Sequence, residues 1–186
     1  MATTADIRNG LVLDLDGQLM QVTYFQHVKP GKGGAFVRTK LRNVRTGAVL
    51  DRTFTSGERL TDVRLEHRPI QFSYSDGHFY HFMDLQTFDD IMLNDDLLGA
   101  DQLKYLKEGL ECTGLVHDER VILVELPHFV ELTVVRTDPS VRGDTATGGT
   151  KPATLETGAV VQVPLFLEEG DVIRVDRRED KYLTRV

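Results

Sequence analysis

Lys29-Pro30-Gly31-Lys32-Gly33-Gly34-Ala35-Phe36 is a short basic loop between two segments rich in β-branched and aromatic residues. Residues 22–28 before it and 36–42 after it have the composition of strands, so together they predict a β-hairpin. Pro30 fixes one φ and has no N–H to donate, and the glycines permit positive φ. Because Lys32 is the only residue with a side chain between Gly31 and Gly34, the loop is expected to project this lysine.

Glycines beside lysines first raise the possibility of a nucleotide-binding loop. A Walker loop needs glycine at position 26 and Ser or Thr at position 33, which are Gln26 and Gly33 here. A dinucleotide-binding fingerprint needs a third glycine at Phe36 and a helix after it, and neither is present. Both phosphate-binding motifs are excluded. From residue types alone, an ordinary hairpin tip with solvated lysines stays open.

The net charge of −7 is unevenly distributed along the 186 residues. Residues 1–64 hold ten Lys and Arg against six Asp and Glu, whereas residues 65–127 hold four against thirteen. Residues 128–186 hold eight against ten. The acidic total disfavours wrapping of a free nucleic acid, but the basic N-terminal third is able to meet RNA.

The compartment and the redox state follow from simpler features. No apolar run approaches the length of a membrane span, and the first residues lack the basic and apolar regions of a leader, so we expect cytoplasmic residence and no membrane partner. The single Cys112 excludes an intrachain disulfide, and its neighbours indicate a small packed strand residue rather than a nucleophile.

Short strand patterns fill almost the whole chain and predict three small β-barrels in tandem. Asp16-Gly17 between two apolar segments is a type I′ hairpin signal, and about five short strands in residues 1–64 fit an SH3-like barrel. Residues 65–127 have the order strand, strand, helix, strand, strand, which fits a five-stranded oligonucleotide-binding barrel. Residues 128–186 predict a second barrel of this kind.

The middle third carries the only helical signals. Thr87 with Asp90 three positions later resembles a capping box that starts a helical turn through residues 91–93. Residues 101–106 predict a short helix that Gly109 ends.

No metal, cofactor or catalytic constellation is expected. His78 and His81 are three positions apart, which on a strand places them on opposite faces, and neither has a cysteine or fixed carboxylate partner visible in the sequence. No serine lies in a nucleophile-elbow motif, and no plausible Cys/His pair exists. The chain is therefore predicted not to be an enzyme.

Several motifs resemble one family, bacterial elongation factor P. The loop Lys29-Pro30-Gly31-Lys32-Gly33-Gly34-Ala35-Phe36 resembles that family's modified loop, in which the tip lysine is extended after translation. The other matching segments, in chain order, are Gly143-Asp144-Thr145-Ala146, Lys151-Pro152-Ala153, Gly158, Val161-Gln162-Val163-Pro164 and Glu169-Gly170. The resemblance therefore covers nearly the whole chain.

The resemblance implies a fold and a function. The expected fold is an SH3-like or KOW-like barrel (1–64) followed by two OB-fold barrels (65–127 and 128–186), in an L-shaped, tRNA-like arrangement. The expected function is to bind both ribosomal subunits, between the peptidyl and exit sites, as a monomer and without a cofactor. There the factor stimulates peptide-bond formation and relieves stalling at consecutive prolines.

The same resemblance assigns two sites. The peptidyl-tRNA loop comprises Lys29, Pro30, Gly31, Lys32, Gly33 and Gly34, with Lys32 the target of a lysine-modifying enzyme. The loop Gly143, Asp144, Thr145 and Ala146 is expected to approach messenger RNA in the exit site, with Asp144 either a reader of base or sugar or a turn former. The modification on Lys32 stays open between β-lysylation, an aminopentanol group and none. The alternative functions are an elongation-factor-P-like paralogue and a general RNA-binding β-barrel.

Overall fold

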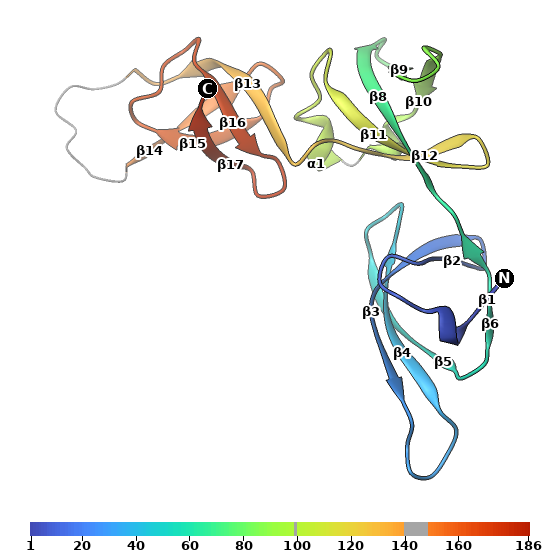
Figure 1. Cartoon of the computed structure of the whole chain (residues 1–186). Coiled ribbons are helices and arrows are strands. Elements are labelled where there is room, and N and C mark those ends of the chain that lie inside the picture. Colours follow the sequence, from blue (N-terminus) through green and yellow to red (C-terminus); the bar gives the residue numbers. More distant parts are fainter. Residues whose placement is uncertain (99, 140–148) are drawn as a thin grey trace. The chain divides into compact units, whose positions relative to one another are not determined.

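The computed structural model describes residues 1–98, 100–139 and 149–186. Almost every regular element in them is a β-strand (Figure 1). The strands form two five-stranded sheets, one closed barrel and one two-stranded sheet. The all-β class with KOW-like and OB-type domains, predicted from the sequence, is confirmed.

The N-terminal sheet has the strand order β5-β4-β3-β2-β7. Its strands are β2 (Val12–Leu15), β3 (Gln18–Val28), β4 (Phe36–Asn43), β5 (Val49–Thr55) and β7 (Asp62–Val63), and beside it β1 (Ala2–Thr3) pairs with β6 (Arg59–Leu60). The 3-10 turn η1 (Thr4–Asp6) follows β1. Asp16 and Gly17 join β2 to β3 with φ of 54° and 83°, so the predicted type I′ hairpin is present.

Side chains on β4 alternate between core and solvent, as a half-buried strand requires. Val37, Thr39 and Leu41 are buried, and Arg38, Lys40 and Arg42 are exposed. Val37 and Leu41 pack into a core with Leu13, Met20, Val22 and Phe54. Burying an apolar side chain of this size stabilises the fold by about 1.5–3 kcal/mol.

The central sheet has the order β10-β9-β8-β11-β12. Its strands are β8 (Glu66–Ser75), β9 (Tyr80–Asp84), β10 (Asp90–Leu93), β11 (Glu111–His117) and β12 (Arg120–Glu125), with η2 (Asp95–Leu97) and α1 (Ala100–Leu103) between β10 and β11.

Two local predictions for this segment need correction. The helical turn predicted through residues 91–93 is wrong, because these residues belong to β10, where Ile91 pairs with Phe82 of β9. The turn before β10 is shaped by the Asp84 carboxylate, which accepts the N–H groups of Gln86 and Thr87. The helix predicted for residues 101–106 forms only as the single turn α1, one residue earlier in the chain.

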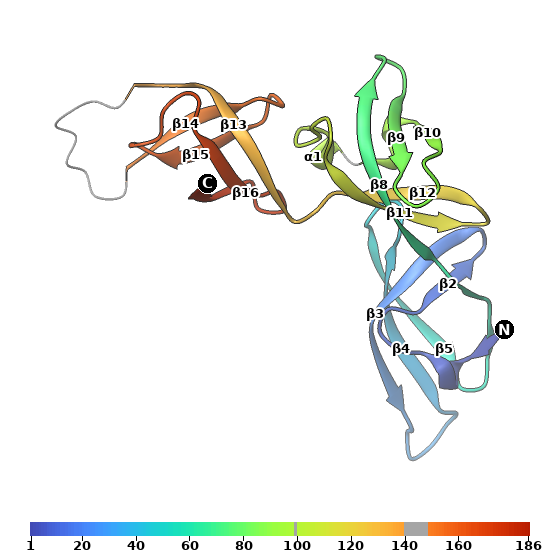
Figure 2. The same ribbon diagram turned by 45° about the horizontal axis from the view of Figure 1, so that its top comes forward.

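The C-terminal strands close into a barrel of order β13-β14-β15-β17-β16 (Figure 2). They are β13 (Phe129–Thr137), β14 (Thr150–Leu155), β15 (Val160–Pro164), β16 (Val172–Asp176) and β17 (Lys181–Arg185). The barrel closes through the parallel pair β15 and β17, where Gln162 faces Lys181. The central sheet has the same strand order, opened between its third and fifth strands, so both follow OB-type topology.

The chain divides into two compact units. Residues 1–67 and 115–123 form the first, and residues 68–114 and 124–186 form the second. The boundaries predicted after residues 64 and 127, and the predicted tRNA-like arrangement, stay predictions. None of the helices that the structure describes is long and apolar enough to cross a membrane.

Candidate functional site

The predicted loop lies at the end of the β3–β4 hairpin (Figure 1). Val28 and Phe36 form the last strand pair, so residues 29–35 make up the connection. Residues 29–34 are all exposed, whereas Ala35 is partly buried. The hairpin therefore carries Lys32 beyond the paired part of the sheet.

The glycines of the loop serve different purposes. Gly33 has a φ of +106°, which side-chain-bearing residues rarely adopt, whereas Gly31 and Gly34 lie outside the positive-φ region. A Cβ added to Gly33 would lie 3.9 Å from Cγ of Pro30, an ordinary contact distance. The backbone conformation, and not lack of space, therefore requires glycine at position 33. The sequence predicted that any of the three glycines could adopt positive φ, and only Gly33 does so.

The base of the loop is fixed, in contrast to its tip. The Ser56 N–H donates to the Ala35 carbonyl at 3.0 Å, and the Arg38 guanidinium lies 5.4 Å from the centre of the Phe36 ring. Within the described residues, no hydrogen bond or ion pair engages the ammonium group of Lys29 or Lys32. Both lysines are thus available to a partner, on a loop whose ends are held.

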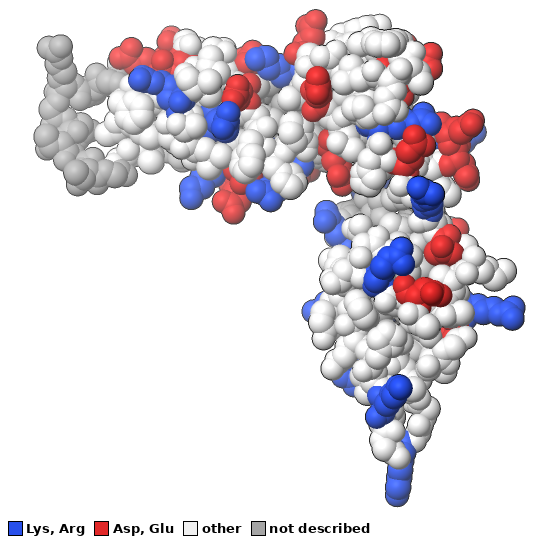
Figure 3. Space-filling view, viewed as in Figure 1, with Lys and Arg blue, Asp and Glu red and all other residues white. Residues whose placement is uncertain are grey.

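A row of cations continues from the loop along β4. Arg38, Lys40 and Arg42, here called the basic row, alternate with core residues and are all exposed. Lys40 faces the exposed Tyr24 of β3 and Asp51 of β5. Figure 3 shows Lys and Arg side chains on this part of the chain, including the end of the hairpin. This arrangement can hold an anionic backbone beside an aromatic side chain.

The second predicted site, Gly143, Asp144, Thr145 and Ala146, lies outside the described residues. The residues that flank it are fastened to the barrel. Lys151, only 5% exposed, donates from Nζ to the Asp138 carbonyl at 2.5 Å. The Thr137 hydroxyl donates to the Pro152 carbonyl at 3.0 Å. Lys151 and Pro152 of β14 therefore hold the end of β13 through hydrogen bonds.

A histidine with carboxylate partners was missed by the sequence interpretation. Nε2 of His81 lies 2.9 Å from Oδ2 of Asp76, and Nδ1 lies 3.7 Å from Oδ2 of Asp90. The Tyr74 ring stacks on the imidazole at 4.3 Å. The hydrogen bond to Asp76 raises the pKa of His81 and lowers that of Asp76. The expectation that neither His78 nor His81 has a fixed carboxylate partner is thus wrong for His81.

This histidine cluster does not resemble a metal centre. Across residues 1–98, 100–139 and 149–186, no group of three or more His, Cys, Asp or Glu side chains is placed to hold a metal ion. Cys112 is buried, and burial raises the pKa of its thiol to about 12, which suits a packed strand residue.

Comparison with known proteins matches family descriptions to three successive parts of the chain. The family description "Elongation factor P (EF-P) KOW-like domain" matches residues 3–60, "Elongation factor P (EF-P) OB domain" matches 65–124, and "Elongation factor P, C-terminal" matches 130–185.

Curated relatives match over the full length of the chain. Proteins named elongation factor P are 53% identical in Pelotomaculum thermopropionicum and 52% in Moorella thermoacetica, each covering 100% of both chains. The elongation factor P of Streptomyces coelicolor is 52% identical and covers 100% of this chain and 99% of the relative.

Solved structures show the same fold at low sequence identity. A translation initiation factor 5A family protein from Naegleria fowleri matches with a TM-score of 0.55 and 11% identity, over 67% of this chain and 96% of that one. Eukaryotic translation initiation factor 5A from Methanococcus jannaschii matches with a TM-score of 0.50 and 17% identity, over 68% and 92%. With three family descriptions in order and relatives identical at half of all positions, the chain belongs to the elongation factor P family.

Proposed function

We propose that this protein binds the ribosome between the peptidyl and exit sites and stimulates peptide-bond formation at consecutive prolines. Its membership of the elongation factor P family supports a role in translation. The observation that carries the finer proposal is the Lys32 loop, in which an exposed lysine that binds none of the described residues stands on a hairpin whose base is fixed.

The loop acts by positioning. Proline is a poor substrate for peptide-bond formation because its nitrogen is a hindered secondary amine and its ring restricts the approach of donor and acceptor. A side chain that holds the CCA end of peptidyl-tRNA lowers the entropic cost of aligning the two reactants. In this proposal Lys29, Pro30, Gly31, Lys32, Gly33 and Gly34 form the contact loop, and the ribosome supplies the chemistry.

The basic row extends this contact along the peptidyl-tRNA. Arg38, Lys40 and Arg42 point from one face of β4, and cations spaced along a strand suit consecutive phosphates. These contacts add affinity without reading sequence, which fits a factor that must accept many different tRNAs. Lys32 at the tip then provides the contact that acts on the reacting end.

Modification of Lys32 is part of the proposal. A modifying enzyme needs access to the lysine Nζ, and the exposed tip offers it. A longer side chain would reach further along the CCA end than lysine alone. Intact mass measurement of protein from its native source tests this directly, since an unmodified mass would remove the modification from the proposal.

Three further parts of the proposal come from family membership. The domains are residues 1–64, 65–127 and 128–186, and they contact both ribosomal subunits. The loop Gly143, Asp144, Thr145 and Ala146 contacts messenger RNA in the exit site. The protein acts as a monomer in the cytoplasm and is not an enzyme.

Chemical footprinting tests the binding site. Ribosomes holding peptidyl-tRNA in the peptidyl site are probed with and without the protein, and then with an excess of deacylated tRNA that fills the exit site. We expect protection of the peptidyl-tRNA acceptor end and loss of protection when the exit site is filled. Protection confined to the aminoacyl site, or unaffected by exit-site tRNA, would reject the proposed location.

A further inference from the structure

The second compact unit contains two parts, residues 68–114 and the barrel from Phe129 onward, together with the linker that enters the barrel. Both parts bind the linker between β12 and β13. On one side, Gln102 of α1 donates to the Val124 carbonyl at 3.3 Å and accepts the Leu126 N–H at 2.9 Å. The side-chain amide therefore fixes the end of β12.

The barrel holds the next residues of the linker through one arginine. Arg177, in the turn between β16 and β17, donates from Nη2 to the Leu126 carbonyl at 2.8 Å and from Nε to the Pro127 carbonyl at 2.9 Å. Its own N–H donates to the His128 carbonyl at 3.0 Å. A linker fixed in this way cannot swing freely, because its carbonyl groups would lose charge-assisted hydrogen bonds.

A buried tyrosine connects the two parts at a second place. Tyr105, which follows α1, is 0% exposed, and its hydroxyl donates to Oδ1 of Asp180 at 2.6 Å. The Lys104 ammonium lies 2.8 Å from the same oxygen. Burial and this hydrogen bond raise the pKa of Tyr105, and the two donors lower the pKa of Asp180. Tyr105 therefore stays protonated and Asp180 stays ionised at physiological pH.

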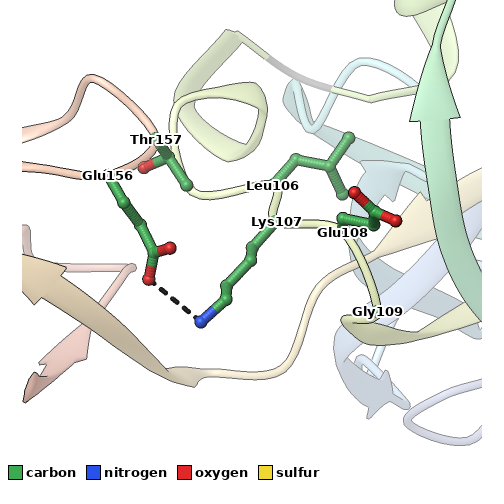
Figure 4. A pocket seen from close by; sticks show the side chains of 6 residues that line it. All are labelled: Leu106, Lys107, Glu108, Gly109, Glu156 and Thr157. Atoms are coloured by element: carbon green, nitrogen blue, oxygen red, sulfur yellow. Dashed lines mark ion pairs between the residues drawn. The ribbon is translucent and has the colours of Figure 1, made fainter.

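The turn between β14 and β15 makes a third connection (Figure 4). Oε1 of Glu156 lies 2.9 Å from Nζ of Lys107, and the same oxygen accepts the Thr133 N–H inside the barrel. The Thr157 hydroxyl donates to the Lys104 carbonyl at 2.5 Å. In Figure 4 the Lys107 and Glu156 side chains point toward each other from the two sides of a pocket.

We propose that these contacts lock residues 68–114 and the C-terminal barrel into one rigid body, with Tyr105 and Asp180 as positioning residues of the lock. Contacts at the linker and at two separate turns restrain rotation about more than one axis, which a single contact could not do. Removal of the Asp180 carboxylate leaves the hydroxyl of the fully buried Tyr105 without its acceptor, a loss that water cannot easily repair. The consequence for translation rests on the proposed function: when the barrel binds, it orients the preceding part of the chain.

A distance measurement tests the lock without the ribosome, so its outcome is independent of the proposed function. Spin labels are placed through Met92→Cys and Val160→Cys, both exposed positions on the two sides, in a Cys112→Ala background. Pulsed electron paramagnetic resonance then records the distance distribution. Tyr105→Phe removes only the hydroxyl. Asp180→Gly removes the carboxylate and is compatible with the φ of 53° at this position.

The matched control is Asp118→Gly, the same change at another aspartate with positive φ, 48°, in the β11–β12 turn. We expect one narrow distance peak in the parent and in this control, and loss of the narrow peak in Tyr105→Phe and Asp180→Gly, with far-UV circular dichroism unchanged. A broad distribution in the parent would overturn the proposal. So would a narrow peak that both lock variants retain.

Discussion

Nε2 of His81 and Oδ2 of Asp76 are 2.9 Å apart and join β9 to the turn that precedes it. Asp76 also accepts the N–H groups of His78 and Phe79, so one carboxylate shapes the turn and binds the imidazole. Asp90, on the neighbouring edge strand, also faces the ring, with Oδ2 3.7 Å from Nδ1. The charged form of His81 is therefore favoured by carboxylates on two sides.

This pair predicts a pH-dependent stability. Because the folded pKa of His81 is raised, its contribution is fully present below the unfolded pKa of about 6.5 and is lost as pH rises through the folded value. Asp76 has a lowered folded pKa, so its contribution is present above its ordinary value and is lost only in strong acid. The pair should stabilise most in weakly acidic solution.

Urea unfolding from pH 5 to pH 9 measures this effect. The stability difference between wild type and His81→Gln should be largest near pH 5 to 6 and should shrink toward pH 9. His78→Gln, at an exposed position three residues earlier, is the control and should show little difference at any pH. A His81→Gln difference that is constant with pH would contradict the ion pair.

The buried Lys151 predicts a stability effect in the C-terminal barrel. Lys151→Met keeps the aliphatic stem but leaves the Asp138 carbonyl without its donor, so unfolding should become easier by about 1–3 kcal/mol. Lys181→Met, the same change at an exposed site of β17, should stay within about 0.5 kcal/mol of wild type. Denaturant melts of both variants compare the two. Equal stability losses would show that burial of Lys151 has no energetic role.

The positive φ of Gly33 predicts a loop defect that Gly34 does not share. Gly33→Val forces a β-branched residue into a left-handed conformation, whereas valine at Gly34 meets open space and an ordinary φ. Pro30→Ala should act in the same direction by widening the unbound ensemble. If the loop positions its target, saturating amounts of Gly33→Val should give a lower rate with nearly normal ribosome affinity. A loss confined to affinity, or equal in Gly34→Val, would exclude this explanation.

The basic row predicts salt-dependent binding. Replacement of Arg38, Lys40 and Arg42 by glutamine should weaken ribosome binding and flatten its dependence on salt concentration, because fewer counterions are released. Arg120→Gln, at an exposed position of β12, provides the single-charge control. Binding titrations at several salt concentrations measure this dependence for wild type and both variants. An unchanged slope in the triple variant would mean that the row does not touch phosphate.

Local turn chemistry explains which parts of the fold could be predicted. Asp16-Gly17 specifies its own hairpin because only small or flexible residues accept two successive positive φ values. Thr87 and Asp90 offered an equally local helix signal, but pairing of β10 with β9 prevailed over it. Local signals decide a turn when no strand competes for the same residues.

The parts that could not be predicted depend on distant partners. Tyr105 and Asp180 are 75 positions apart, and nothing beside either residue identifies the other. The loop motif was visible because Pro30, Lys32 and Gly33 lie within four consecutive residues. The fixing of its base by Ser56 required the fold, since Ser56 follows a different strand.

The central claim is that Lys32 acts at the reacting ends of the tRNAs and has no role in the fold. Peptide synthesis by purified ribosomes on a template with three consecutive prolines tests it most directly, with wild type, Lys32→Ala and Lys181→Ala compared. The two variants remove the same charge from exposed sites, so both should melt like wild type. We predict that Lys181→Ala stimulates synthesis fully and that Lys32→Ala loses most of the stimulation on the proline template, with no difference on a proline-free template. Full stimulation by Lys32→Ala would contradict the account.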